Sequence, residues 1–149
     1  MKRDVILTHE FVEYIPDYLS DGIIYVSIPF ATAVHKCCCG CGNEVVTPLS
    51  PTDWKLIFDG VSISLDPSIG NWGFRCKSHY FIRHNRAVWA PRWSQDQIIA
   101  GRAHDRFLKE RYYDTSAGDR KREVEDKDSA ESSKAKRSFW QKIIAWLSK

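Results

Sequence analysis

The residues best suited to chemistry in this 149-residue chain are its five cysteines. Four of them crowd into the segment 37–41, and the fifth begins the sequence Cys76-Lys-Ser-His79. Thiolates and imidazoles are ligands that structural zinc prefers, and two tight turns can each supply two of them. The spacing therefore predicts a tetrahedral Zn2+ site, and an odd number of cysteines argues against a disulfide framework.

More than one set of four ligands is compatible with this spacing. Cys76 and His79 are the firmest candidates from the second turn, and Cys41 is the firmest from the first. Adjacent cysteines point in different directions, so the remaining ligand is one of the other three cysteines of segment 37–41. His35 is expected either to support a ligand or to replace one.

The predicted metal site is expected to be structural, because enough thiols are present to close the coordination shell. The nearest carboxylates, Glu44 and Asp53, stand in no recognisable relation to the cysteines. A surplus thiol, Cys38 or Cys39, could instead act as a nucleophile if the nearby ion lowered its pKa. A zinc-adjacent thiol enzyme in acyl or thioester transfer is therefore an alternative.

Several strands are expected to position these turns. Residues 22–28 form a β-branched and aromatic run that is typical of a buried strand. Asp59-Gly60 separates two alternating segments, 54–58 and 61–65, which predicts a hairpin with a type I′ turn and with Val61, Ile63 and Leu65 on one face. A second hairpin is expected from 80–83 and 87–90.

After the second hairpin the pattern becomes helical. Ser94 and Gln97 form a capping box, and the apolar spacing that follows predicts a helix over about 95–112. The expected fold class is α+β, a small β-rich zinc-binding domain with hairpins and a C-terminal helix.

Charge and composition divide the chain into three parts. Residues 1–66 carry 4 basic and 9 acidic side chains, whereas residues 67–112 carry 9 basic and 3 acidic ones. We predict a zinc-binding domain over 1–112, a disordered charged linker over 113–138 and an amphipathic helix over 139–149. That last helix is expected to dock on a protein partner or fold back, and less readily to contact a membrane surface. No secretory signal is recognisable, so the expected location is the cytoplasm.

Four segments together resemble a family of small bacterial cysteine-rich proteins of unknown function. They are residues 35–44, 47–51, 67–72 and 76–82, and the likeness covers about residues 1–93. Genes for this family often stand beside those of bacterial ubiquitin-like conjugation systems. The resemblance implies a zinc-binding accessory protein, with a role in an antiphage conjugation pathway. By position it implies the metal set Cys37, Cys39, Cys41, Cys76 and His79.

The function predicted from the sequence is that of a non-enzymatic, zinc-stabilised adaptor that recruits another protein, with ubiquitin-like conjugation machinery as the expected partner. Besides the thiol enzyme, a nucleic-acid-binding module is an alternative, because arginines interleave with aromatic residues over 72–93. Strand alternation would place those aromatic rings inward, which makes nucleic acid the less favoured partner.

Overall fold

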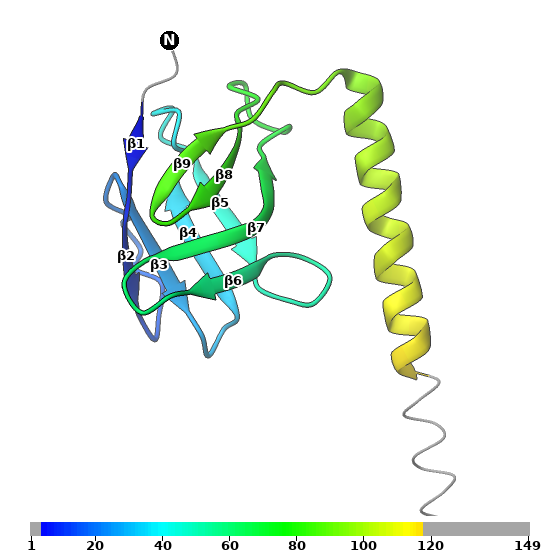
Figure 1. The fold of residues 1–149 in the computed structure, drawn as a ribbon, viewed down its shortest axis with the longest axis horizontal. Coiled ribbons are helices and arrows are strands. Elements are labelled where there is room, and N and C mark those ends of the chain that lie inside the picture. The colour runs from blue at the N-terminus through cyan, green and yellow to red at the C-terminus, as the bar shows by residue number, and fades with distance from the viewer. Residues whose placement is uncertain (1–3, 118–149) are drawn as a thin grey trace, which may run out of the picture. The chain divides into compact units, whose positions relative to one another are not determined.

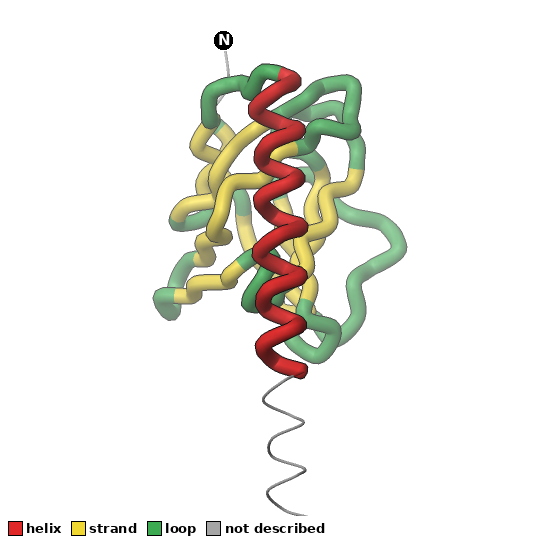
Figure 2. The backbone as a smooth tube through the Cα atoms, turned by 90° about the vertical axis from the view of Figure 1, so that its right-hand side faces the viewer, coloured by secondary structure: helices red, strands yellow, loops and turns green. Residues whose placement is uncertain are grey.

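The structure is a computed structural model and describes residues 4–117. These residues form nine strands followed by one helix over 95–117 (Figures 1 and 2). The strands are β1 (Val5–Ile6), β2 (Thr8–Phe11), β3 (Ile23–Ser27), β4 (Thr32–Lys36), β5 (Glu44–Pro48), β6 (Lys55–Phe58), β7 (Ile63–Gly70), β8 (His79–Arg83) and β9 (Arg86–Trp89).

The strands make two sheets. One has the order β1-β9-β8-β7-β6 and the other the order β2-β3-β4-β5. Neighbouring strands are antiparallel except for β2 and β3, which run parallel. A single buried cluster draws side chains from both sheets, among them Ile24 and Val26 from β3 and Leu65, Tyr80 and Ile82 from β7 and β8. The prediction of an α+β fold is confirmed.

The second predicted hairpin is confirmed, and its turn is tighter than expected. Arg83 pairs with Arg86, so only His84 and Asn85 lie in the turn. Both have positive φ angles of 46° and 60°, as a two-residue hairpin turn of the type I′ class requires.

The first predicted hairpin forms, but its turn differs from the expected one. Phe58 pairs with Ile63, which leaves a four-residue loop in place of a two-residue type I′ turn. The Asp59 carboxylate accepts hydrogen bonds from the backbone N–H groups of Val61 and Ser62, at 2.9 and 2.6 Å, and so favours the longer loop. The expectation that Val61 lies on one face with Ile63 and Leu65 was therefore wrong: Val61 belongs to the loop and is 82% exposed, whereas Ile63 and Leu65 are fully buried.

The capping box that predicted the helix is present. The Ser94 backbone N–H donates to Gln97 Oε1 at 2.8 Å, and the Gln97 backbone N–H donates to Ser94 Oγ at 3.2 Å. The helix extends to residue 117, five residues into the segment predicted as a linker. Thr115 and Ser116 donate their hydroxyl hydrogens to backbone carbonyls one turn earlier, and no glycine or proline interrupts the last four turns before Gly118.

The rest of the predicted linker, 118–138, and the predicted terminal helix, 139–149, lie outside the described residues. Contacts divide the chain after Ala103, so that residues 1–103 form one unit. Within the described part of the chain, no helix has the length and apolar character needed to cross a bilayer.

Candidate metal centre and serine–histidine pair

Four cysteine sulfurs converge where two turns meet. One turn follows β4 and supplies Cys37, Cys39 and Cys41, and the other precedes β8 and supplies Cys76. All four sulfurs lie within 4.8 Å of one another. The Sγ–Sγ distances are 3.4 Å for Cys37–Cys39, 4.0 Å for Cys37–Cys76 and 3.7 Å for Cys41–Cys76.

These distances fit one tetrahedral metal ion. Four thiolates bound at about 2.3 Å to a central zinc ion stand about 3.8 Å from one another. The three separations lie on both sides of that value, and no covalent bond links the thiols. The donor set and its size therefore suit a four-sulfur metal site.

Local sequence explains how the first turn brings its thiols together. The Cys37 backbone N–H donates to the Asn43 carbonyl at 2.8 Å, which closes the turn. Gly40 and Gly42 have φ angles of 81° and 78°, which glycine adopts without steric cost. The turn over residues 37–43 is therefore tight, and the sulfurs of every second residue, Cys37, Cys39 and Cys41, lie close together.

Polar groups approach two of these sulfurs. Ser78 Oγ lies 3.1 Å from Cys37 Sγ, and the Asn43 side-chain amide donates to Cys41 Sγ at 3.2 Å. Partial burial opposes ionisation of Cys41, but hydrogen bonds from the Asn43 backbone, Cys39, Cys76 and the Asn43 side chain outweigh it and lower the pKa of Cys41 to about 7. Such contacts favour the thiolate, the form that binds a metal, although burial outweighs them at Cys37 and raises the pKa of its thiol.

Cys38 lies outside the sulfur group. It belongs to the buried apolar cluster, and burial raises the pKa of its thiol to about 12. A buried thiol of this kind does not favour a nucleophile. Cys39, the other thiol that the thiol-enzyme alternative names, is a member of the sulfur group.

His79, the fifth predicted ligand, also lies outside the sulfur group, and both of its ring nitrogens have other partners. Nε2 is 2.9 Å from Ser68 Oγ, and Nδ1 is 2.7 Å from the Pro91 carbonyl oxygen. A carbonyl oxygen can only accept, so Nδ1 carries the hydrogen in the neutral ring. Nε2 is then an acceptor, and the Ser68 hydroxyl donates to it.

An irregularity in β7 brings Ser68 to His79. Leu65 pairs with Ile82 and Ile69 pairs with Tyr80, so three β7 residues, 66–68, stand opposite one residue of β8. Such bulges bend a strand and redirect its side chains. Arg83 of β8 contacts the bulge: its guanidinium donates a hydrogen bond to Asp66 Oδ1 at 2.9 Å.

Two tryptophans pack against the histidine. The rings of Trp72 and Trp93 stack with centroids 5.5 Å apart, and their centroids lie 5.0 and 5.3 Å from that of His79. Gly70, opposite His79 in the ladder, makes room: a Cβ at this position would clash with the Trp72 indole. As a result His79 is only 5% exposed.

A second serine–histidine contact lies at the tip of the first hairpin, but its geometry differs. Ser62 Oγ and Asp59 Oδ2 both approach the same atom, His84 Nδ1, at 3.3 and 3.1 Å. In a catalytic triad the acid and the nucleophile bind opposite nitrogens of the ring. This cluster is a polar turn network, in which hydrogen bonds from Ser62 and Val61 lower the pKa of Asp59.

His35, predicted to support or replace a ligand, is fully buried and does not reach the sulfurs directly. Its Nε2 lies 2.9 Å from Tyr80 Oη, which accepts from Asn71 Nδ2 at 3.4 Å. Asn71 in turn donates to Cys37 Sγ at 3.7 Å. Burial lowers the pKa of His35 to about 4, so its imidazole is neutral at neutral pH.

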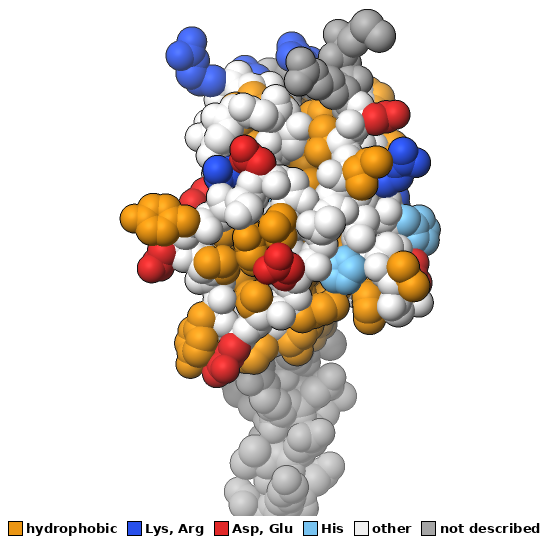
Figure 3. Space-filling view, turned by 90° about the vertical axis from the view of Figure 1, so that its left-hand side faces the viewer, with side chains coloured by type: hydrophobic (Ala, Val, Ile, Leu, Met, Phe, Trp, Pro, Cys, Tyr) orange, Lys and Arg blue, Asp and Glu red, His pale blue; other side chains and the backbone are white. Residues whose placement is uncertain are grey.

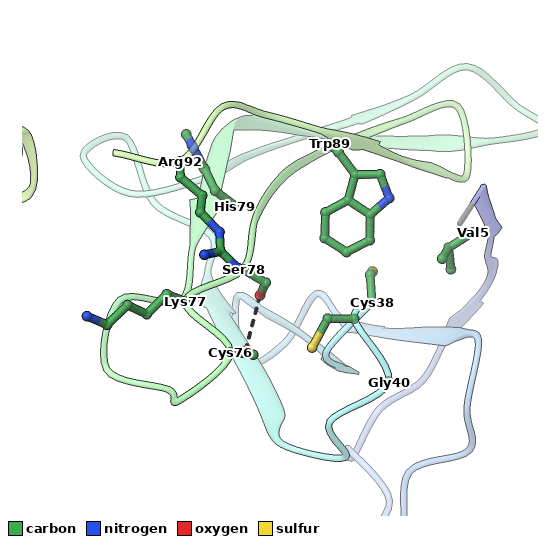
Figure 4. Close-up of a pocket in the computed structure, with 10 residues that line it drawn as sticks. Val5, Cys38, Gly40, Cys76, Lys77, Ser78, His79, Trp89 and Arg92 are labelled. Atoms are coloured by element: carbon green, nitrogen blue, oxygen red, sulfur yellow. Dashed lines mark hydrogen bonds between the residues drawn. The ribbon is translucent and has the colours of Figure 1, made fainter. Parts of the chain in front are cut away.

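A cavity of about 630 Å³ lies between the sulfur group and His79. In Figure 4, Arg92 lies beside Ser78 and His79, and Trp89 stands above Cys38. Tyr80 is fully buried, Trp72 and Trp89 are half-buried and Trp93 is 39% exposed. Most rings of this segment are therefore packed, which does not favour a stacking platform for nucleic acid.

The residue pattern pointed to the cysteines but not to Ser68 or Pro91. Ser68 lies in one of the segments that carry the family resemblance, but no motif singled it out. Every residue has a backbone carbonyl, so a sequence cannot single out that of Pro91. The pairing of β7 with β8 brings Ser68 to His79, and no local motif encodes that pairing.

Comparison with known families relates the chain to a bacterial family. The model of the family described as bacterial ubiquitination-like system serine protease (BubE) matches residues 11–90, just over half of the chain. The matched range contains the four grouped cysteines, Ser68 and His79. No curated protein and no solved structure matches the chain.

Proposed function

Because the chain belongs to the BubE family of bacterial ubiquitination-like systems, we propose that it is a serine protease with Ser68 as nucleophile and His79 as general base. The observation that carries this proposal is the position of the His79 ring between Ser68 Oγ and the Pro91 carbonyl. A nucleophile, a base and a third group that orients the base are the parts that covalent acyl transfer needs. Here a backbone carbonyl takes the orienting place that a carboxylate holds in a Ser-His-Asp triad.

The reaction follows from these hydrogen bonds. Ser68 Oγ attacks the carbonyl carbon of the substrate, and its proton passes to His79 Nε2. His79 then gives that proton to the leaving amine as the C–N bond breaks, which leaves an ester on Ser68. Water hydrolyses the ester, with His79 taking the water's proton and returning it to Ser68.

We further propose that the grouped cysteines Cys37, Cys39, Cys41 and Cys76 hold one structural zinc ion. The ion supplies a cross-link between the two turns and no reaction step. Cys76 stands three residues before His79, and Ser78, which contacts Cys37, is adjacent to His79. The cross-link would therefore fix the start of β8, the strand that carries the base.

The substrate that we propose is a polypeptide of the ubiquitination-like system, cleaved at a peptide or isopeptide bond. The family supports protein partners within that machinery. An aromatic cluster of Phe11, Phe58 and His9, with centroids 5.2–5.6 Å apart, offers a contact surface for such a partner. Phe11 and Phe58 are about half exposed, and Figure 3 shows apolar side chains interspersed with acidic ones on one face of the molecule.

The adaptor function predicted from the sequence remains the second candidate, because that aromatic cluster could recruit a protein without any catalysis. The two functions differ in one property. An adaptor does not need a reactive Ser68, whereas the protease does.

A fluorophosphonate probe tests the proposal, since it forms a covalent adduct with an activated serine. We expect zinc-loaded protein to be labelled at Ser68, identified by mass spectrometry of the adduct. Ser68→Ala should abolish the adduct. Ser62→Ala, which alters the other serine–histidine contact, should leave labelling unchanged. Absence of an adduct at Ser68 in folded, zinc-loaded protein would favour the adaptor.

A further inference from the structure

The part of β7 that carries Ser68 has one edge without a strand beside it. β6 accompanies β7 only from Ile63 to Asp66, where Asp66 pairs with Lys55. Beyond that pair β7 continues to Gly70, and β8 pairs with it on the other side through Ile69 and Gly70 (Figure 1). Among the described residues, no strand pairs with residues 67–70 on the side of β6. We call these four residues the open edge of β7.

An open strand edge offers backbone hydrogen-bonding groups to another extended chain. Pro67 lacks a backbone N–H, as is common for proline at sheet edges or bulges, so any backbone donor on the open edge comes from residues 68–70. Ser68 follows directly, so the proposed nucleophile belongs to the edge itself. A chain added at the usual spacing of about 4.8 Å would lie beside the backbone of Ser68.

A groove borders the open edge on the side of β6. It has a volume of about 520 Å³. Its apolar walls are Leu49, Pro51, Trp54, Leu56 and Pro67, and the polar residues Ser50, Asp53, Lys55 and Asp66 complete its lining. These apolar walls suit an apolar side chain of a chain lying next to β7.

We propose that the substrate binds as an extended strand on the open edge of β7, with an apolar side chain in this groove. This inference rests on the proposed protease function. An extended polypeptide segment is the occupant that fits, because strand addition pairs backbone with backbone and brings a peptide bond to Ser68. Side chains of an added strand alternate, so every second residue faces away from the groove. The favoured cleavage site is therefore a flexible tail or linker, not a helix or a folded loop.

Peptidyl phosphonates test this mode of binding, because they join a peptide to a group that reacts with an activated serine. We would compare the diphenyl phosphonate of acetyl-Leu-Leu-Leu-Gly with the same compound carrying one N-methyl group at each amide in turn. A methyl group on an amide that pairs with β7 should slow labelling of Ser68 about tenfold, the equivalent of one hydrogen bond. Methylation of an amide that points away should change the rate less than about twofold, which gives a period of two.

A matched pair of variants tests the groove. Leu56→Ala should slow labelling by the unmethylated peptidyl phosphonate about tenfold, because a buried leucine contact is lost. Ile57→Ala changes the neighbouring β6 residue, which is 43% exposed and does not line the groove, and should leave that rate unchanged. Labelling by the small fluorophosphonate should be equal in both variants and so report that each is folded.

The two proposals fail in different ways. If the small fluorophosphonate labels Ser68 but the N-methyl series shows no alternation, or if Leu56→Ala matches Ile57→Ala, strand addition is wrong and the protease proposal stands. If neither probe labels Ser68, the protease proposal fails and the substrate-binding mode fails with it.

Discussion

A histidine can bind a metal or move a proton, and its two ring nitrogens decide which. The Cys-x-x-His spacing predicted a ligand from residue types alone, and a sequence does not state where a ring points. In the structure both nitrogens of His79 face oxygen atoms, one in Ser68 and one in Pro91. The neighbouring residues Ser78 and Tyr80 reach the network around Cys37. Successive residues of an extended chain point to opposite sides, so His79 points away from Cys37 whereas Ser78 and Tyr80, on either side of it, point toward Cys37.

His79→Ala separates the two roles. We expect the variant to keep about one zinc per chain, measured by inductively coupled plasma mass spectrometry, because four sulfurs suffice for the ion. Fluorophosphonate labelling of Ser68 should fall at least about 100-fold, since the general base is lost. Cys76→Ser provides the comparison, because it should lower the zinc content. Loss of zinc from His79→Ala to the level of Cys76→Ser would make His79 a ligand.

Gly70 gives a second prediction at the residue scale. Gly70→Ala would place a Cβ against the Trp72 indole and force that ring from its contacts with Trp93 and His79. We expect a loss of about 1–3 kcal/mol in the free energy of unfolding by urea, as overpacking commonly costs. Slower labelling of Ser68 should accompany that loss. Gly73→Ala is the control, because a Cβ at residue 73 would meet nothing within 4 Å. Equal stability of the two variants would contradict the packing role of Gly70.

At the scale of elements, the sequence predicted what local patterns encode. The strand over 22–28, the hairpin at residues 84–85 and the capped helix all follow from residue types at short range. The prediction of a two-residue turn at Asp59 was wrong. The Asp59 carboxylate accepts hydrogen bonds from the backbone N–H groups of Val61 and Ser62, and this favours a four-residue loop.

Pairings between distant segments lay outside the reach of local patterns. The parallel pairing of β2 with β3 and the pairing of β1 with β9 join separate segments. The residues of each segment carry no local pattern that predicts its partner strand. The bulge over 66–68 belongs to the same class, and it sets the position of Ser68. The grouping of the two cysteine turns could therefore be predicted from spacing, whereas the contact between Ser68 and His79 depends on strand register.

The two cysteine turns make a prediction at this scale. Removing the metal with a chelator should loosen the start of β8 and the turn after β4, because no disulfide replaces the lost cross-link. We expect the thermal midpoint and Ser68 labelling to fall together and to recover when zinc is restored. An unchanged midpoint after verified removal of the metal would contradict a structural role.

Single-cysteine variants sharpen this prediction. Cys41→Ser should lose zinc, because Cys41 belongs to the sulfur group and is exposed, so the change disturbs little else. Cys38→Ala should keep about one zinc per chain, because its thiol lies in the apolar cluster outside that group. Loss of zinc from Cys38→Ala with retention in Cys41→Ser would reverse the assignment of the ligands.

At the scale of the whole molecule, everything that the proposed site needs lies in the unit that ends at Ala103. Both apolar clusters draw on residues between Val5 and Trp89, and the matched family range ends at residue 90. The next residues still contribute, because the Pro91 carbonyl orients His79 and the Trp93 ring stacks on Trp72. Ile98, in the first turn of the helix, is 5% exposed. The boundary of this unit therefore falls inside the helix rather than at the end of the last strand.

Two truncations test where that boundary lies. A chain that ends at Ala103 should keep its thermal midpoint within about 3 °C of the full chain and should keep Ser68 labelling, because no core residue is removed. A chain that ends at Arg92 keeps the Pro91 carbonyl but loses the Trp93 stack and the buried Ile98 side chain. Those losses amount to about 2–4 kcal/mol, which corresponds to a midpoint lower by at least about 10 °C in a unit of this size. Labelling should slow as well, because removal of Trp93 exposes His79 to water. Equal midpoints for the two truncated chains would show that residues 93–103 do not belong to the folded unit.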